Sequence, residues 1–452
     1  MTRSAADVES AADPPDERDR APVVAVLVAA VVIAVTAAVG GWLAVGGVDL
    51  HLLGGTVLRG RYDVHLDPAV AFPVAVGLAG VLWGPALARW APWGALLPGS
   101  AGAAALWAVA LAVSGGWHRL TEPLASRYEY PYDVDRVGAL GPFLATFNDH
   151  VPAASADPWT THVSGHPPAA LLAFVLLDRT GLGGLGWAAA LCIAVGALAV
   201  PAVLVAVRTV ADEPTARTVA PFAVLAPTAL WIATSADAIF AGVAAWGVAA
   251  LAVAAARERR RAPWAVGGGL LLGLALFLSF GLTSLGLLAL AVVVVQWRAI
   301  GRAGVVQVLV LGAVGVLVVF AAFAAGGYNW FDGLSVTADR VRSGPSYTDR
   351  PLAFFLVANL AAAAIAAGPA AVAGLGALRR RALALLPAAV VAGMLVSDLT
   401  GLVRGETERI WLPFTVWLAA ATAFLPARQR RGWLAAAVVV ALVVEVTVRT
   451  EW

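Results

Sequence analysis

The sequence predicts an all-α polytopic membrane protein with about 13 transmembrane helices. Of its 452 residues, 61% are hydrophobic and only 13% are charged. Apolar runs of about 20 residues recur along nearly the whole chain, which is the length needed to cross a hydrocarbon layer about 30 Å thick. Histidines and most arginines fall at opposite ends of these runs. A soluble protein of this size would need far more polar surface to cover its core.

The elements can be assigned in order along the chain. Residues 1–20 are small, polar and charged, and we expect a disordered cytoplasmic tail. The apolar run from Ala21 to about Val45 is too long for a signal-peptide core and is interpreted as a retained first helix. Residues 21–452 then form a single multi-span membrane domain. The predicted spans are 22–45, 69–88, 94–114, 187–208, 218–234, 238–256, 264–281, 283–297, 304–325, 352–376, 382–397, 410–426 and 432–448.

The distribution of charge orients this arrangement. Short cytoplasmic loops of membrane proteins carry an excess of arginine and lysine, so the N-terminus is predicted inside the cell and Trp452 outside. All six histidines then lie on the outer side. The arginines at the inner ends are Arg89, Arg208, Arg217, Arg257, Arg259, Arg260, Arg261, Arg298, Arg302, Arg379, Arg380, Arg381, Arg428, Arg430 and Arg431. The long outer segments are 46–68, 115–186, 326–351 and 397–409, so the working surface is predicted on the extracytoplasmic face of the cell membrane.

The apolar segment after His166 tests this topology. Residues 167–180 have only about half the length of a membrane span. If the segment crossed the membrane, the arginine clusters at 257–261, 379–381 and 428–431 would lie outside, against the positive-inside rule. We therefore interpret it as a re-entrant or interfacial helix. Pro167 and Pro168 suit its start, because proline is tolerated in the first helical turn.

Composition also excludes several classes of function. The single cysteine, Cys192, allows no disulfide within the chain and no site built from several cysteines. The formal charge of +2 is sorted by side rather than gathered into a basic patch. Nucleic-acid binding therefore has no support, and the expected partners include membrane lipids.

The first motif with chemical potential is residues 128–135 (YEYPYDVD), which offers the carboxylates Glu129, Asp133 and Asp135. Asp133 and Asp135 could hold a divalent cation, Mg²⁺ or Mn²⁺, through oxygen ligands. Alternatively, one of the three carboxylates could take a proton from an acceptor hydroxyl. A solvated loop with ordinary acidic residues is the third interpretation. Nothing in the sequence indicates another cofactor.

The second motif places histidine and aspartate before the short helix. Asp149 and His150 are followed by residues 159–168 (WTTHVSGHPP), which contain His162 and His166. A helix start presents unpaired N–H groups and a partial positive charge, which suits a phosphate. The alternative is that His162 and His166 cap the helix and bond to the loop backbone.

The third motif is residues 401–414 (GLVRGETERIWLPF), where four charges meet at the start of a predicted span. Charges there are costly unless they are paired or face a watery cavity. Arg404 or Arg409 could hold a lipid-linked phosphate, because an arginine fork matches its geometry. Glu406 and Glu408 would orient them. Ion pairs that only anchor the helix end are the alternative.

Two further segments receive structural interpretations. Asp237 lies at an outer turn and is interpreted as a helix N-cap. Residues 328–332 and 347–351 are aromatic and polar, and are interpreted as membrane-interface residues.

Together these motifs resemble the GT-C class of integral membrane glycosyltransferases, which includes protein O-mannosyltransferases and lipid A aminoarabinose transferases. The resemblance rests on the DxD-like triplet Asp133-Val134-Asp135 in an early outer loop, on His166-Pro167-Pro168 and on the number of spans. The tract around residues 404–414 is similar to one in actinobacterial members. Two spans more than is usual in the class precede the acidic loop.

The resemblance implies an inverting transfer of a sugar, mannose or a pentose, on the extracytoplasmic face. The donor would be a polyprenyl-phosphate sugar and the acceptor a lipid or glycan, since no soluble sugar-binding domain is present. Asp133 or Asp135 would be the base, with Glu129 as a further candidate. His166 would border the donor phosphate, and Arg404 or Arg409 would neutralise it as it leaves.

Two other functions share the many spans. A transporter or flippase of a lipid-linked glycan should place polar residues along a path at mid-membrane, and the predicted spans hold few. A non-catalytic envelope assembly protein would tolerate loss of Asp133, Asp135 and His166.

Overall fold

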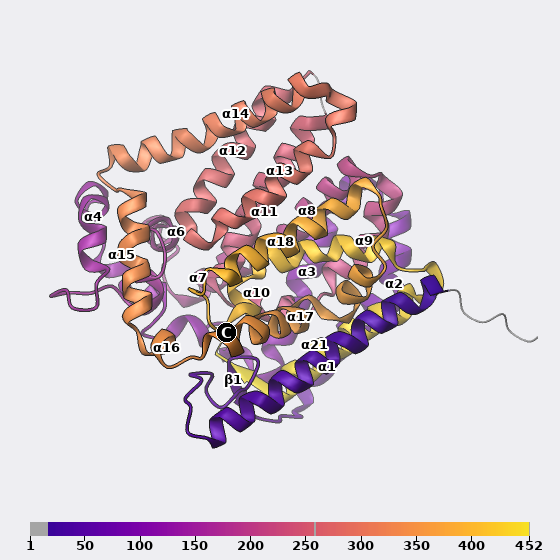
Figure 1. Ribbon diagram of the computed structural model, residues 1–452, viewed down its shortest axis with the longest axis horizontal. Helices are drawn as coiled ribbons and strands as arrows, with labels where there is room; N and C mark the ends of the chain where they lie inside the picture. The colour runs from indigo at the N-terminus through magenta and orange to yellow at the C-terminus, as the bar shows by residue number, and fades with distance from the viewer. Residues whose placement is uncertain (1–16, 257–258, 452) are drawn as a thin grey trace, which may run out of the picture.

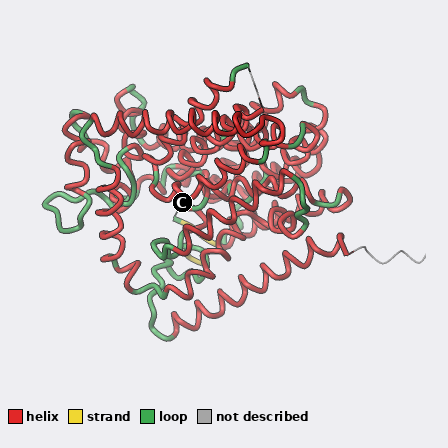
Figure 2. The backbone as a smooth tube through the Cα atoms, turned by 45° about the horizontal axis from the view of Figure 1, so that its top comes forward, coloured by secondary structure: helices red, strands yellow, loops and turns green. Residues whose placement is uncertain are grey.

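The structure is a computed structural model that describes residues 17–256 and 259–451, and it is almost wholly helical (Figures 1 and 2). The predicted tail at residues 1–16, Arg257 and Trp452 lie outside the described residues, whereas residues 17–20 already belong to the first helix. The helices are α1 (Glu17–Val45), α2 (Ala71–Trp90), α3 (Trp93–Ala112), α4 (Leu140–Thr146), α5 (Thr161–Ser164), α6 (Ala169–Arg179), α7 (Leu185–Ala197), α8 (Ala199–Val210), α9 (Glu213–Val224), α10 (Ala229–Ile232), α11 (Ala236–Ala256), α12 (Arg261–Leu278), α13 (Gly286–Val294), α14 (Trp297–Ala325), α15 (Trp330–Ser343), α16 (Pro345–Thr348), α17 (Leu352–Gly376), α18 (Leu385–Leu399), α19 (Thr407–Ile410), α20 (Leu412–Thr415) and α21 (Arg430–Thr447). The described elements also include two short strands, β1 (Gly60–Tyr62) and β2 (Val448–Thr450), and short 3-10 helices.

Within the described residues, nine helical segments are long and apolar enough to cross a membrane. They are Arg20–Val45, Pro68–Trp90, Trp93–Gly115, Leu185–Val210, Ala236–Ala256, Arg261–Leu278, Trp297–Ala325, Leu352–Gly376 and Ala382–Leu399. The polytopic helical class is thus confirmed.

The other four predicted spans are helical but differ from long apolar helices. The spans at 283–297 and 410–426 correspond to the shorter helical segments Phe280–Val294 and Leu412–Phe424. The span at 218–234 is divided into α9 and α10, with Pro227 in the break between them. Proline lacks the N–H that a continuous helix needs. The span at 432–448 is α21, which carries Arg430, Arg431 and Glu445.

Helix α11 lies at the centre of the bundle, and nearly all of its residues are buried. It packs against α7, α8, α12, α13 and α20. The neighbouring pair α12 and α14 approach closely through glycine: a Cβ on Gly269 would lie 2.0 Å from the carbonyl oxygen of Gly312. Small residues at such a contact let two helix backbones come together within a membrane.

Helices α1, α2 and α14 instead expose most of their apolar side chains, among them Leu27, Val31, Val310 and Leu317. Helix α1 packs along α17 at one edge of the bundle (Figure 1). Apolar surfaces of this kind suit contact with lipid tails.

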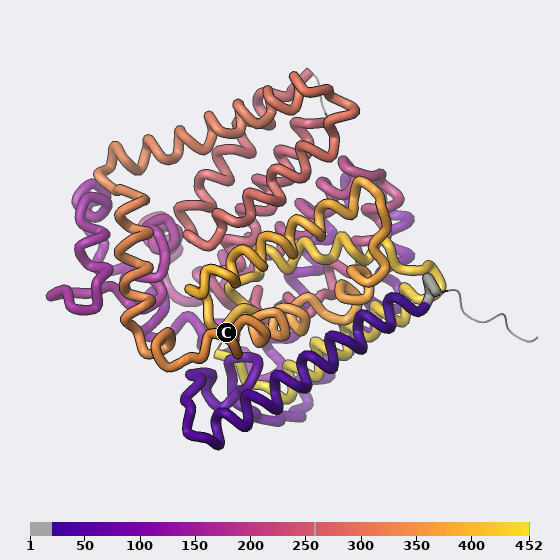
Figure 3. The backbone as a smooth tube through the Cα atoms, viewed as in Figure 1, coloured from indigo at the N-terminus to yellow at the C-terminus, as the bar shows by residue number. Residues whose placement is uncertain are grey.

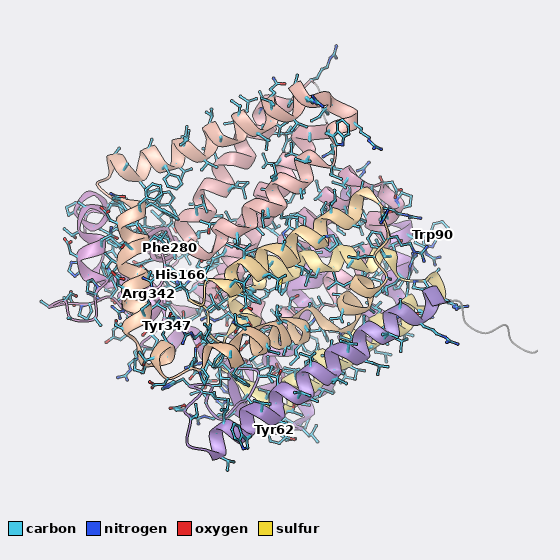
Figure 4. The ribbon with its side chains drawn as sticks, in the orientation of Figure 1. Tyr62, Trp90, His166, Phe280, Arg342 and Tyr347 are labelled. Carbon is cyan, nitrogen blue, oxygen red and sulfur yellow. The ribbon has the colours of Figure 1, made fainter. Side chains whose placement is uncertain are left out.

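The segments predicted as outer loops gather at one end of the bundle. In Figure 1, α4, α15, α16 and β1 lie toward the left, at the ends of the long helices. His166, Arg342 and Tyr347 lie toward the same end, and Trp90 lies at the opposite end (Figure 4). Strand β1 pairs antiparallel with β2, Gly60 opposite Thr450, so a segment that follows the indigo helix α1 meets the C-terminal segment there (Figure 3).

The short helix after His166 is α6, and its predicted start and length are confirmed. Pro168 is its N-cap and it has 11 residues. At about 1.5 Å per residue it is roughly 16 Å long, about half of a membrane span. It packs against the 3-10 helix η5 (Tyr130–Arg136), and also against α12 and α7.

Candidate functional site

Arg409 occupies a buried position between two distant segments. Its Nη1 lies 2.5 Å from Oδ2 of Asp237, and its Nη2 lies 3.3 Å from Oε2 of Glu406. Asp237 lies in the first turn of α11 rather than at its N-cap, so the cap interpretation was wrong. The carboxylate instead fixes the guanidinium that α19 carries.

The carboxylate of Glu406 forms ion pairs with three arginines. Its carboxylate lies 3.1 Å from Arg59, 3.4 Å from Arg350 and 3.3 Å from Arg409. Burial alone would raise the pKa of Glu406, but the three positive charges outweigh it and hold the pKa at about 2. Glu406 is therefore a carboxylate at neutral pH. We call Arg59, Arg350 and Arg409 the arginine cluster.

Backbone contacts from two other segments that were predicted as outer loops fix the arginine cluster. Arg350 donates from Nε to the carbonyl of Leu50 at 2.9 Å and from Nη2 to that of His51 at 2.7 Å. Arg59 donates from Nη1 to the same carbonyl of His51 at 2.9 Å. Segments 50–59 and 406–409 and Arg350 thus form one hydrogen-bonded unit, in which Arg350, Glu408 and Arg409 are buried.

Glu129 faces this unit from the first acidic motif. Its Oε1 lies 2.6 Å from Nδ1 of His162, and its side chain is buried. Burial opposes ionisation, but the charge and hydrogen bond of His162, together with the charge of Arg409, lower the pKa of Glu129 below its usual value. The structure therefore brings Glu129, His162, Glu406 and Arg409 into one charged cluster.

His166 lies next to this pair. Its Nδ1 is 2.8 Å from the carbonyl oxygen of His162 and 2.8 Å from the hydroxyl of Tyr130. A carbonyl only accepts, so Nδ1 carries the proton and Nε2 carries the lone pair. Burial lowers the pKa of His166, so the ring is neutral at neutral pH. It can accept a hydrogen bond but brings no charge to a phosphate.

Asp133 and Asp135 do not form the predicted cation site. Asp133 is fully buried; one oxygen lies 2.6 Å from Nη1 of Arg136 and the other accepts from the N–H of Thr160 at 2.9 Å. Asp135 is exposed. Because Asp133 uses its oxygens inside the loop, the pair does not fit a shared Mg²⁺ or Mn²⁺. In the part of the chain that the structure describes, no group of three or more His, Cys, Asp or Glu side chains could hold a metal ion.

Other predicted site residues have local partners. Arg404 donates from Nη1 to the carbonyls of Tyr347 at 2.6 Å and Arg350 at 2.8 Å, and its guanidinium lies 3.7 Å from the centre of the Tyr347 ring. His150 donates from Nδ1 to a loop carbonyl at 2.8 Å, and Asp149 is exposed. Arg404 therefore holds a loop, and the second motif contributes to the cluster through His162 and His166.

Glu408 is fully buried beside Arg59 of the arginine cluster. Its Oε1 accepts from the backbone N–H of Arg59 at 2.9 Å, and its Oε2 has no hydrogen-bond partner within the described residues. Burial raises the pKa of Glu408 to about 7. This carboxyl group is half protonated near neutral pH.

The fold can be compared with solved structures. The chain superposes on the crystal structure of the Archaeoglobus fulgidus oligosaccharyltransferase, solved with Zn and sulfate, with a TM-score of 0.51 and 15% identity. The match covers 78% of this chain and 53% of that chain. This chain has a GT-C-like fold. The fold class predicted from the sequence is thereby confirmed. The chain spans only about half the length of that oligosaccharyltransferase.

The chain also matches the crystal structure of ArnT from Cupriavidus metallidurans in the apo state, with a TM-score of 0.38 and 18% identity. This match covers 64% of the present chain and 55% of the ArnT chain. No protein-family model matches the chain, and no curated protein matches it. At 15% identity, the match to the oligosaccharyltransferase shows the fold alone.

Proposed function

We propose that this protein is an inverting membrane glycosyltransferase that acts on the extracytoplasmic face. It takes a sugar, mannose or a pentose, from a polyprenyl-phosphate donor and transfers it to a lipid or glycan acceptor. One observation carries the proposal. The Glu129–His162 pair and the arginine cluster lie close together in the interior of a GT-C-like fold.

Arg409 is proposed to contact the donor phosphate. Asp237 and Glu406 fix two of its nitrogens, so its orientation is set before substrate binds. Its pKa is raised above its ordinary value: although burial opposes the charge, Asp237 and Glu406 outweigh it, so it stays positive. Preorganised positive groups stabilise the negative charge that develops on a leaving group without reorganisation during the reaction.

The Glu129–His162 pair is proposed to be the base. The two side chains lie 2.6 Å apart, so the proton is assigned to the pair rather than to one atom. In the transfer, the acceptor hydroxyl oxygen forms a bond to the anomeric carbon, and its proton passes to the pair. The bond from that carbon to the phosphate oxygen breaks, and polyprenyl phosphate leaves with the electron pair.

The test is sugar transfer by the full chain in lipid nanodiscs, with radiolabelled polyprenyl-phosphate sugars and a membrane-lipid extract as acceptor. Glu129→Gln keeps the size of the side chain but removes its basicity. General-base catalysis contributes about 10²–10⁴-fold, so turnover should fall by at least about 100-fold. Glu122→Gln is the matched control, since Glu122 is exposed and lies in the same outer segment.

Product that is lost in Glu129→Gln and retained in Glu122→Gln supports the proposal. Melting temperatures of the variants confirm that each is folded. Full turnover in a folded Glu129→Gln variant, or the absence of product from every donor with the unmodified protein, would reject it.

A further inference from the structure

A cavity of about 270 Å³ lies between η5, α6 and the start of α7. Its lining includes Asp135 and Asp178, and apolar walls made by Pro131, Phe174, Leu177 and Ala188. A cavity that combines apolar walls with a few converging polar groups is the usual form of a small-molecule site. Asp135 lies outside the charged cluster but lines this cavity.

The two carboxylates in this cavity are available to a ligand. Within the described residues, the carboxylates of Asp135 and Asp178 have no hydrogen bond or ion pair, and both residues are exposed to solvent. The two neighbouring arginines point elsewhere: Arg136 pairs with Asp133 at 2.6 Å, and Arg179 donates to the carbonyl of Val137 at 2.9 Å.

This charge balance selects the ligand. The described lining holds two carboxylates and no cation, so it repels phosphate and other anions. Ionised carboxylates are acceptors only, and hydroxyl groups are donors that satisfy them. The cavity is therefore suited to an uncharged group rich in hydroxyls, whereas the arginine cluster is suited to an anion.

The cavity also adjoins the charged cluster. Phe174 in its wall stacks on Tyr130, with ring centres 5.5 Å apart and planes inclined by 15°. Tyr130 follows Glu129 in the chain, and its hydroxyl lies 2.8 Å from Nδ1 of His166. The stacked rings thus connect the wall of the cavity to the segment that carries the proposed base.

The position along the chain gives access from the membrane. Leu185 lines the cavity and begins the candidate span Leu185–Val210. The cavity is therefore located at the end of a membrane-crossing helix, where the head groups of membrane lipids lie. Its volume is slightly below the range of about 300–1,000 Å³ for sites that enclose a drug-sized ligand, and so fits a head group rather than a whole lipid.

We propose that this cavity is the acceptor site, and that it binds the uncharged, hydroxyl-rich head group of a membrane lipid. Asp135 and Asp178 accept hydrogen bonds from the head-group hydroxyls, and Pro131 and Phe174 contact its C–H faces. The inference rests on the proposed transferase function, because only that function makes this ligand an acceptor.

Binding can be measured without turnover. The probes are hexyl glucoside, an uncharged sugar on a short chain, and hexyl phosphate, its anionic counterpart, titrated by calorimetry into the full chain in nanodiscs. Hexyl glucoside should bind the unmodified protein and lose at least about tenfold in affinity in the Asp135→Asn, Asp178→Asn double variant, a loss of about 1.4 kcal/mol. Glu122→Gln, at an exposed acidic residue of the same outer segment, should leave it unchanged.

A cavity-filling variant, Ala188→Phe, tests the same cavity without a change to its carboxylates. The melting temperature of this variant reports whether it folds. Hexyl glucoside binding that is equal in the unmodified protein and the double variant overturns the inference, as does tighter binding of hexyl phosphate that depends on Asp135 and Asp178. If the probe binds as expected but no donor yields product, the site stands as a head-group site and the transferase proposal fails separately.

Discussion

The guanidinium of Arg409 and the carboxylate of Asp237 lie 2.5 Å apart, although 172 residues separate them in the chain. Both side chains are about 4% exposed, so water screens this ion pair very little. The pair joins the central helix α11 to the short helix α19 and fixes the arginine proposed to meet the donor phosphate.

Asp237→Ala should destabilise the protein strongly. Removal of one partner of a buried ion pair leaves an uncompensated charge and typically costs about 3–5 kcal/mol. The matched control is Asp339→Ala, since Asp339 forms a 3.3 Å pair with Arg342 in which both side chains are more than half exposed. Exposed pairs contribute about 0–1 kcal/mol. Thermal melting in nanodiscs measures both, and equal shifts would contradict the assignment of a buried pair.

Arg409 and Arg404 should respond differently to substitution by lysine. Arg409→Lys keeps the charge but loses the fork that spans Asp237 and Glu406, so turnover per folded molecule should fall at least about tenfold. Arg404→Lys should lower the melting temperature, because Arg404 holds the carbonyls of Tyr347 and Arg350, while turnover per folded molecule stays near that of the unmodified protein. Transfer assays normalised to folded protein compare the two. A larger turnover loss in Arg404→Lys would assign the phosphate contact to Arg404.

Glu408 should make stability depend on pH. Its pKa is about 7 in the folded protein, because of burial, against an ordinary value of 4.5. The folded state therefore binds this proton more tightly than the unfolded state, and the stability it contributes is present below about pH 4.5 and is lost as pH rises through about 7. Since one pKa unit corresponds to about 1.4 kcal/mol, the loss amounts to roughly 3 kcal/mol.

Glu408→Gln removes this titration and keeps an oxygen to accept from the N–H of Arg59. Its melting temperature relative to the unmodified protein should rise between pH 5 and pH 8. Melting curves across that range are the measurement. A difference that stays constant with pH would show that Glu408 does not titrate there, and Glu122→Gln serves as the control for an exposed carboxylate.

The predicted topology can be tested with single cysteines. Ser343 and Arg259 are both exposed, and the predicted topology places them outside and inside the cell. Ser343→Cys should react with an impermeant thiol reagent in whole cells, and Arg259→Cys should react only after lysis. The native Cys192 is fully buried and should give little background. Labelling of Arg259→Cys alone in whole cells would invert the topology and place the proposed site in the cytoplasm.

Some of the site was predictable from sequence because its signal is local. Arg404, Glu406, Glu408 and Arg409 stand within six residues at the start of an apolar run, where charges need partners. Glu408 and Arg409 are indeed buried, and the half-buried Glu406 pairs with Arg409. The short helix α6 was predictable for the same reason, since its two prolines and its limited apolar length are features of one segment.

The acidic motif shows where local reasoning failed. Asp133 and Asp135 are adjacent enough in sequence to suggest a shared cation. They lie in the 3-10 helix η5, however, which has about three residues per turn, so side chains two positions apart point in different directions. Asp133 turns inward to Arg136 and Thr160, and Asp135 lines the cavity with Asp178. Glu129, the remaining candidate of the motif, is the one that meets His162.

The sequence by itself determined that the chain is a helical membrane protein, because hydropathy and helical length depend on residues close together along the chain. Only the tertiary structure decided which charges lie together in the candidate site. Arg59, Asp237 and Arg350 come from three separate segments and carry no local signal. Their role arises from burial around Glu406 and Arg409, where a charge is stable only beside an opposite charge.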